Sequence, residues 1–110
     1  METSKELTDS VFEAIEVAKA TGKIRKGVNE VTKSVERGEA KLAIIAKDVN
    51  PPELTMHLPV LGKEKGIKVV EVSSKEELGA AAGLSVSTAA IVIVKEGDAK
   101  ESVKSIIAQL

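Results

Sequence analysis

Short aliphatic segments alternate along this chain with segments whose apolar residues recur at helical spacing. Residues 42–46, 67–72 and 89–94 are rich in β-branched or other aliphatic residues and lie between charges, glycines or prolines, which is typical of buried strands. Because strands and helices alternate through short connections, the sequence predicts an α/β fold, a layered sandwich with helices on both faces of one central sheet.

The helical segments have recognisable starts and stops. Five helices are predicted: residues 7–20, from 28 to a stop at 38, from 54 to a stop between 62 and 66, from 74 to a stop at 83, and from 98 through 107. Ser74, followed three residues later by Glu77, matches a capping box. Asp98 is expected to cap the last helix. Residues 23–26 remain unassigned.

Composition excludes several kinds of protein. A chain of 110 residues buries roughly 60 to 70% of its unfolded surface, so residues 1–110 can fold as one domain without a metal or disulfide. No cysteine is present, which excludes disulfides, thiolate zinc sites, iron–sulfur clusters and a cysteine nucleophile. Phe12 is the single aromatic residue, so bases have no aromatic platform of the kind that RRM and OB domains use.

No apolar run reaches membrane-spanning length and residues 1–10 lack a signal-like apolar core, so we expect a cytoplasmic protein with no membrane partner.

The charge is balanced but unevenly distributed. The formal net charge is -1. Residues 1–21 carry five acids and two lysines, whereas residues 22–41 carry six bases and three acids. The basic charge is therefore local, which says more about the chain than its net charge does.

The sequence offers little for catalysis. His57 is the only histidine, so no dyad or histidine metal site can form around it, and a structural or surface role is expected. Glu77 is better explained as a cap than as half of an acid–base pair with Glu76. Gly79 and Gly83 are spaced as small residues that let a helix pack closely on a sheet. No phosphate-binding or dinucleotide motif is present, and no cofactor is indicated.

The second predicted helix has a chemically mixed outer face. At ~100° per residue, its apolar side is formed by Val28, Val31 and Val35. Its polar side carries Asn29, Glu30, Lys33 and Arg37. An amide, a carboxylate and an ammonium can together match a patterned hydrogen-bonding surface such as exposed guanine edges. Gly27 leaves the helix N-terminus open for a phosphate. A merely solvated face and a face that binds a partner protein remain the alternatives.

The loop after Gly83 places two branched apolar residues, Leu84 and Val86, on either side of Ser85. One interpretation is that Leu84 and Val86 begin the last strand. The other is that they form an exposed apolar lip beside the second helix, able to cover unstacked bases.

Four motifs resemble the archaeal ribosomal protein L7Ae family, and the similarity extends over nearly the whole chain. They are IRKGVNEVTKSVERG at 24–38, KLAIIAKDVNP at 41–51, HLP at 57–59 and SKEELG at 74–79. The resemblance implies a three-layer α-β-α sandwich with a central mixed four-stranded sheet. It also implies a non-enzymatic protein, monomeric when free, that binds the kink-turn, an RNA helix bent at a three-nucleotide bulge beside sheared G·A pairs.

The same resemblance implies partners and residue roles. Family members serve in the large ribosomal subunit, in box C/D and H/ACA guide ribonucleoproteins and in RNase P, so rRNA, guide RNA, RNase P RNA and assembly proteins are the expected partners. The implied RNA-binding residues are Lys26, Gly27, Asn29, Glu30, Lys33, Arg37, Asn50, Lys75, Leu84, Ser85 and Val86.

Within that set the implied roles differ. Asn29, Glu30 and Lys33 match the residues that contact the guanines of the G·A pairs. The loop 84–86 matches the segment that packs on the bulged nucleotides, and Val86 stands where other branches carry a basic residue. Asn50 stands where relatives usually hold an acid near the extruded base.

Overall fold

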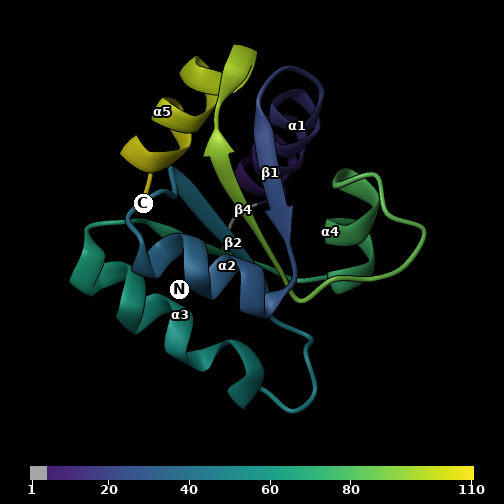
Figure 1. Ribbon diagram of the computed structural model, residues 1–110. Helices are drawn as coiled ribbons and strands as arrows, with labels where there is room; N and C mark the ends of the chain where they lie inside the picture. Colours follow the sequence, from purple (N-terminus) through teal and green to yellow (C-terminus); the bar gives the residue numbers. More distant parts are fainter. Residues whose placement is uncertain (1–4) are drawn as a thin grey trace.

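The computed structural model describes residues 5–110 and has one four-stranded sheet between two groups of helices (Figure 1). The strands are β1 (Lys23–Lys26), β2 (Leu42–Ala46), β3 (Val69–Val72) and β4 (Ala90–Lys95). The helices in this part of the chain are α1 (Lys5–Thr21), α2 (Val28–Glu36), α3 (Glu53–Lys65), α4 (Lys75–Ala81) and α5 (Lys100–Ala108), with a 3-10 turn η1 (Gly97–Ala99) before α5. The predicted α/β sandwich is confirmed.

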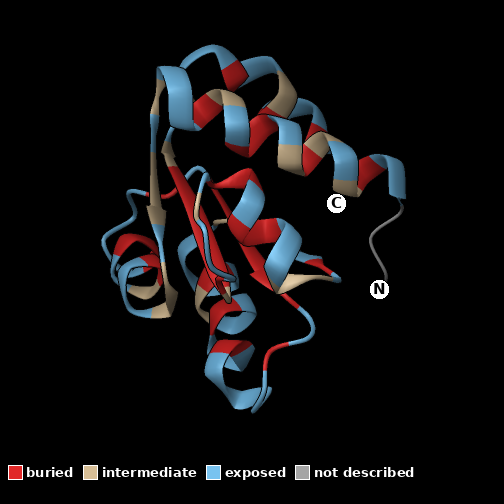
Figure 2. Cartoon of the chain, turned by 90° about the vertical axis from the view of Figure 1, so that its right-hand side faces the viewer, coloured by how far each residue is buried: buried red, intermediate tan, exposed pale blue. Residues whose placement is uncertain are grey.

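The sheet is mixed and its strand order is β1-β4-β2-β3. β4 pairs antiparallel with both β1 and β2, whereas β2 and β3 are parallel. Every residue of the central strand β2 is buried, because helices cover both faces of the sheet. Figure 2 shows this burial along the central strands and on the inward sides of the helices.

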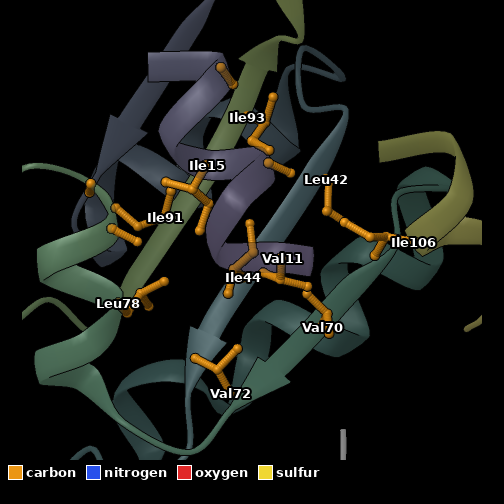
Figure 3. Close-up of a cluster of buried hydrophobic side chains, with 14 of the residues drawn as sticks. Val11, Ile15, Leu42, Ile44, Val70, Val72, Leu78, Ile91, Ile93 and Ile106 are labelled. Atoms are coloured by element: carbon orange, nitrogen blue, oxygen red, sulfur yellow. The ribbon is translucent and has the colours of Figure 1, made fainter. Parts of the chain in front are cut away.

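Alternate residues of β2 enter two separate cores, since successive side chains of a strand point to opposite faces. Leu42 and Ile44 pack with α1, α4 and α5 in the larger cluster, around the fully buried Ile15 (Figure 3). Ala43 and Ile45 pack with α2 and α3 in the smaller cluster. Aliphatic residues dominate both cores, as the near absence of aromatic residues requires.

The structure adds one strand, corrects one expectation and excludes one of the two interpretations of the loop after Gly83. Residues 23–26 form the edge strand β1, which the sequence left unassigned. Asp98 does not cap α5: it lies in η1, and its backbone N–H donates to Oγ1 of Thr21 at 2.8 Å. Leu84 and Val86 do not begin the last strand, because β4 starts at Ala90. The N-cap of α4 is confirmed, since Oγ of Ser74 accepts the N–H of Glu77.

Glu2, which contributes to the acidic charge of residues 1–21, lies outside the described residues. Among residues 5–110, no helix has both the length and the apolar character needed to cross a bilayer.

Candidate nucleic-acid interface

Most of the predicted site residues lie where β1, β2 and β3 end and β4 begins. From these strand ends the chain enters α2, the loop before α3, and α4, and it returns to β4 through residues 82–89. This edge lies toward the lower right of Figure 1, where β1 runs into α2 beside the start of β4. The topology therefore gathers segments that are far apart in the sequence.

The N-terminus of α2 is open. Gly27 precedes the helix with φ of 92°, a conformation that L residues rarely adopt, and no side chain caps the helix. The backbone N–H of Gly27 donates to the carbonyl oxygen of Ala90 at 3.0 Å. The N–H groups of the first turn have no partner within a helix and carry its positive dipole end, so this terminus suits a phosphate.

The predicted division of α2 into two faces is confirmed. Val31 and Val35 are fully buried in the smaller core, whereas Asn29, Glu30 and Lys33 are exposed. Lys33 lies one turn beyond Asn29 and Glu30, so the three side chains share one stretch of surface.

Lys26 and Arg37 lie on either side of that stretch, at different distances from it. Lys26 is exposed at the end of β1, next to the open helix terminus. Arg37 is the C-cap of α2, eight residues after Asn29 and so about 12 Å away along the helix axis. Arg37 therefore lies one turn beyond Lys33, at the end of α2 farthest from Lys26, Gly27 and Asn29.

Arg25 forms an ion pair with Glu30, and the sequence did not point to Arg25 as a site residue. The guanidinium Nη1 lies 3.7 Å from Oε2 of Glu30, and the two side chains are 34% and 51% exposed. Arg25 comes from β1, so the ion pair connects the edge strand to the first turn of α2. The sequence did not predict β1, so nothing in it placed Arg25 beside Glu30.

His57 has a structural contact, in line with expectation. Its Nε2 lies 2.8 Å from Oγ1 of Thr32. Because that hydroxyl donates its own hydrogen to the carbonyl oxygen of Val28 at 2.7 Å, the imidazole nitrogen donates to it. The contact joins α3 to α2.

The loop after β2 is tied to α4. Oδ1 of Asp48 accepts the backbone N–H of Lys75 at 2.8 Å, and this carboxylate lies at the positive end of α4. Asn50 is exposed two residues later, and Lys75 is partly buried. Asp48 was not among the predicted site residues, since a contact across 27 residues leaves no local pattern.

The loop 84–86 is an apolar lip of uneven exposure. Leu84 is half-buried and packs against the larger core, Ser85 is exposed, and Val86 is 67% exposed. The expectation for Gly79 needs correction: its close neighbour is the backbone of Val86 in this loop, not the sheet. Gly83 has φ of 76° and lies against Lys19.

The carbonyl oxygen of Ala90 connects the lip to α2. It accepts hydrogen bonds from the N–H of Gly27 and from the hydroxyl of Thr88, the latter at 3.2 Å.

The predicted residues at these strand ends are called the composite edge from here on. It consists of Lys26, Gly27, Asn29, Glu30, Lys33, Asn50, Lys75, Leu84, Ser85 and Val86. A hollow of about 450 Å³ between α1, β3 and α4 is lined by none of these residues. The composite edge is a surface that can contact a large ligand.

Comparison with known proteins agrees with the fold. Residues 9–103 match the ribosomal protein L7Ae/L30e/S12e/Gadd45 family. Among solved structures, the chain is similar to the Giardia lamblia 15.5kD RNA binding protein, with 34% sequence identity and a TM-score of 0.93. The match covers 97% of this chain and 89% of the Giardia chain.

Proposed function

Because the chain belongs to the ribosomal protein L7Ae/L30e/S12e/Gadd45 family, we propose that it binds RNA through the composite edge and that its target is the kink-turn. One observation carries the proposal. The Glu30 carboxylate, paired with Arg25, is exposed on the first turn of an uncapped helix, and hydrogen bonds at Ala90 join that helix to the loop that presents Val86. The edge thus combines groups for base edges, for phosphate and for unstacked bases.

The proposed contacts divide into two kinds, because phosphate contacts position a nucleic acid while base contacts specify it. Asn29, Glu30 and Lys33 contact guanine edges of the G·A pairs, with the carboxylate accepting from guanine N–H groups. Lys26, the open terminus at Gly27, Lys75 and Arg37 contact phosphates. Arg37, at the far end of α2, reaches the backbone of a flanking stem.

The remaining contacts are to bases outside the pairs. Val86, supported by Leu84 and Ser85, covers the bulged nucleotides by van der Waals contact. The amide of Asn50 accepts a hydrogen bond from the extruded base.

The proposed mechanism is stabilisation of one RNA shape. A kink brings phosphates close together, so unliganded RNA resists bending unless cations screen the repulsion. A protein that binds only the bent form shifts the RNA population toward it by its differential affinity for the two states. The protein acts as a clamp and not as a catalyst.

We also propose the biological setting. The bound RNAs are rRNA, box C/D and H/ACA guide RNAs and RNase P RNA, and the protein acts in the cytoplasm as a monomer that recruits assembly proteins. Its processes are ribosome biogenesis and tRNA processing.

A gel-shift titration tests the proposal directly. The probe is an RNA with a three-nucleotide bulge and tandem G·A pairs, and the control is the same RNA with Watson–Crick pairs in their place. Tight binding to the first and weak, salt-sensitive binding to the second is expected. Equal binding to both would remove the specificity claim, and binding to neither would favour a protein partner for α2.

A further inference from the structure

We propose that Gly79 is a positioning residue for Val86: its lack of a side chain lets the lip backbone lie directly on α4, which fixes the exposed valine for RNA contact. The inference rests on the proposed function for its RNA readout. A β-carbon at Gly79 would overlap the carbonyl oxygen of Val86 and lie 3.1 Å from Cα of Ser87. The loop thus passes α4 at a distance that only glycine permits.

Two hydrogen bonds hold the loop along the helix. The N–H of Leu84 donates to the carbonyl oxygen of Gly79 at 2.9 Å, and the N–H of Thr88 donates to that of Lys75 at 3.1 Å. As the loop advances from residue 84 to 88 it therefore runs back along α4 from residue 79 to 75. Val86 lies midway between the two ties, with its side chain mostly in solvent.

Backbone freedom does not account for Gly79. Its φ is not positive, so any residue could adopt its conformation, and glycine is second only to proline as the least favourable residue in a helix interior. Alanine would favour the helix and would exclude the loop. Gly79 thus weakens α4 locally, and the close packing of the Val86 backbone compensates.

The consequence is a lip that is ordered before RNA arrives. Ordering a flexible segment on binding costs free energy, and a preorganised segment avoids that cost. Because the side chain of Val86 is not buried in the protein, the backbone ties and the contact at Gly79 determine where it points.

The test compares Gly79→Ala with Gly62→Ala. Gly62 is a buried helical glycine on α3, where a β-carbon would lie 2.7 Å from the carbonyl oxygen of Ile67 and from Cγ2 of Val69. It reproduces the steric collision at the end of α3 near the start of β3, away from the composite edge. Hydrogen exchange of the free proteins reports on the loop without any RNA.

In Gly79→Ala we expect the amides of Leu84 and Thr88 to exchange faster than in the wild type, while Gly62→Ala leaves both unchanged. With kink-turn RNA, Gly79→Ala binds about tenfold more weakly, which corresponds to losing the contact of one valine. Gly62→Ala binds like the wild type. Unchanged exchange and unchanged affinity in Gly79→Ala would overturn the proposal.

A double variant separates positioning from general damage. If Gly79 acts through Val86, adding Gly79→Ala to Val86→Ala causes no further loss of affinity, because coupled residues are non-additive. Losses that multiply would contradict the proposal.

Two further results keep the test decisive. If Gly79→Ala does not fold, hydrogen exchange of the wild-type protein provides the test. Unprotected amides at Leu84 and Thr88 would show that the loop is not fixed and would overturn the inference. If the wild type does not bind kink-turn RNA, the proposed function fails, while the exchange comparison still decides whether Gly79 holds the lip.

Discussion

The backbone N–H of Gly27 donates to the carbonyl oxygen of Ala90 at 3.0 Å, and this bond fixes the start of α2 against the start of β4. The same oxygen accepts the hydroxyl of Thr88, which ends the loop that carries Val86. A polar helix terminus and an apolar lip, 50 to 60 residues apart in sequence, are thereby joined in one edge.

Replacing Glu30 by Ala should weaken binding to kink-turn RNA by roughly 5- to 150-fold, the range for one good base-reading contact. The loss is informative because removing a negative charge should otherwise favour RNA. Binding curves measured with and without G·A pairs check it. Glu36→Ala is the matched control, since Glu36 is an exposed glutamate at the other end of α2. Equal losses in both variants would contradict a base-reading role for Glu30.

Replacing Lys26 by Ala should weaken binding modestly and reduce the slope of log K against log salt concentration by about one unit, because one phosphate contact is lost. The slope is measured by fluorescence anisotropy across a salt series. Lys104→Ala, an exposed lysine on α5, should leave the slope unchanged. A normal slope in Lys26→Ala would exclude the phosphate contact.

Replacing Val86 by Ala removes two methyl groups from the lip and should weaken binding by about tenfold without lowering stability, because the side chain is largely exposed in the free protein. Val60 on α3 is 62% exposed and provides the control Val60→Ala. An RNA that lacks the bulged nucleotides should bind wild type and Val86→Ala equally. A deficit that persists on that RNA would place the valine contact elsewhere.

Replacing Arg25 by Ala should weaken kink-turn binding by roughly twofold to fivefold, as expected for a half-exposed ion pair that orients Glu30. In the Glu30→Ala background the effect should disappear, because there is no carboxylate left to orient. Arg37→Ala serves for comparison: its effect should be similar in both backgrounds, since Arg37 lies at the far end of α2. Independent effects of Arg25 and Glu30 would show that the ion pair does not position the carboxylate.

The sequence predicted the parts of the fold that depend on local periodicity. The spacing of Val28, Val31 and Val35 gave the correct buried side of α2, and therefore the exposed positions of Asn29 and Glu30. The edge strand β1 was not predicted, because three of its four residues are charged. Its exposure does not alternate along the strand either, and charged residues are usual at a protected sheet edge.

Contacts that depend on tertiary placement or on the path of a loop could not be predicted. The bond from Lys75 to Asp48 depends on how α4 is placed, and the packing of Gly79 on Val86 depends on how the next loop turns back; no spacing in the sequence reports either. The residue type of Asp98 suggested a helix cap. Instead, Asp98 lies in a 3-10 turn, and its backbone N–H donates to the hydroxyl of Thr21 at the end of α1.

The central claim is that one edge of this protein holds RNA in a sharply bent form. The most direct measurement is energy transfer between dyes on the two helical ends of a kink-turn RNA, titrated with protein in buffer without divalent cations. The account predicts that transfer rises to a plateau at one protein per RNA, and that RNA without the G·A pairs shows no rise. No change in transfer on binding, or the same rise for both RNAs, would contradict it.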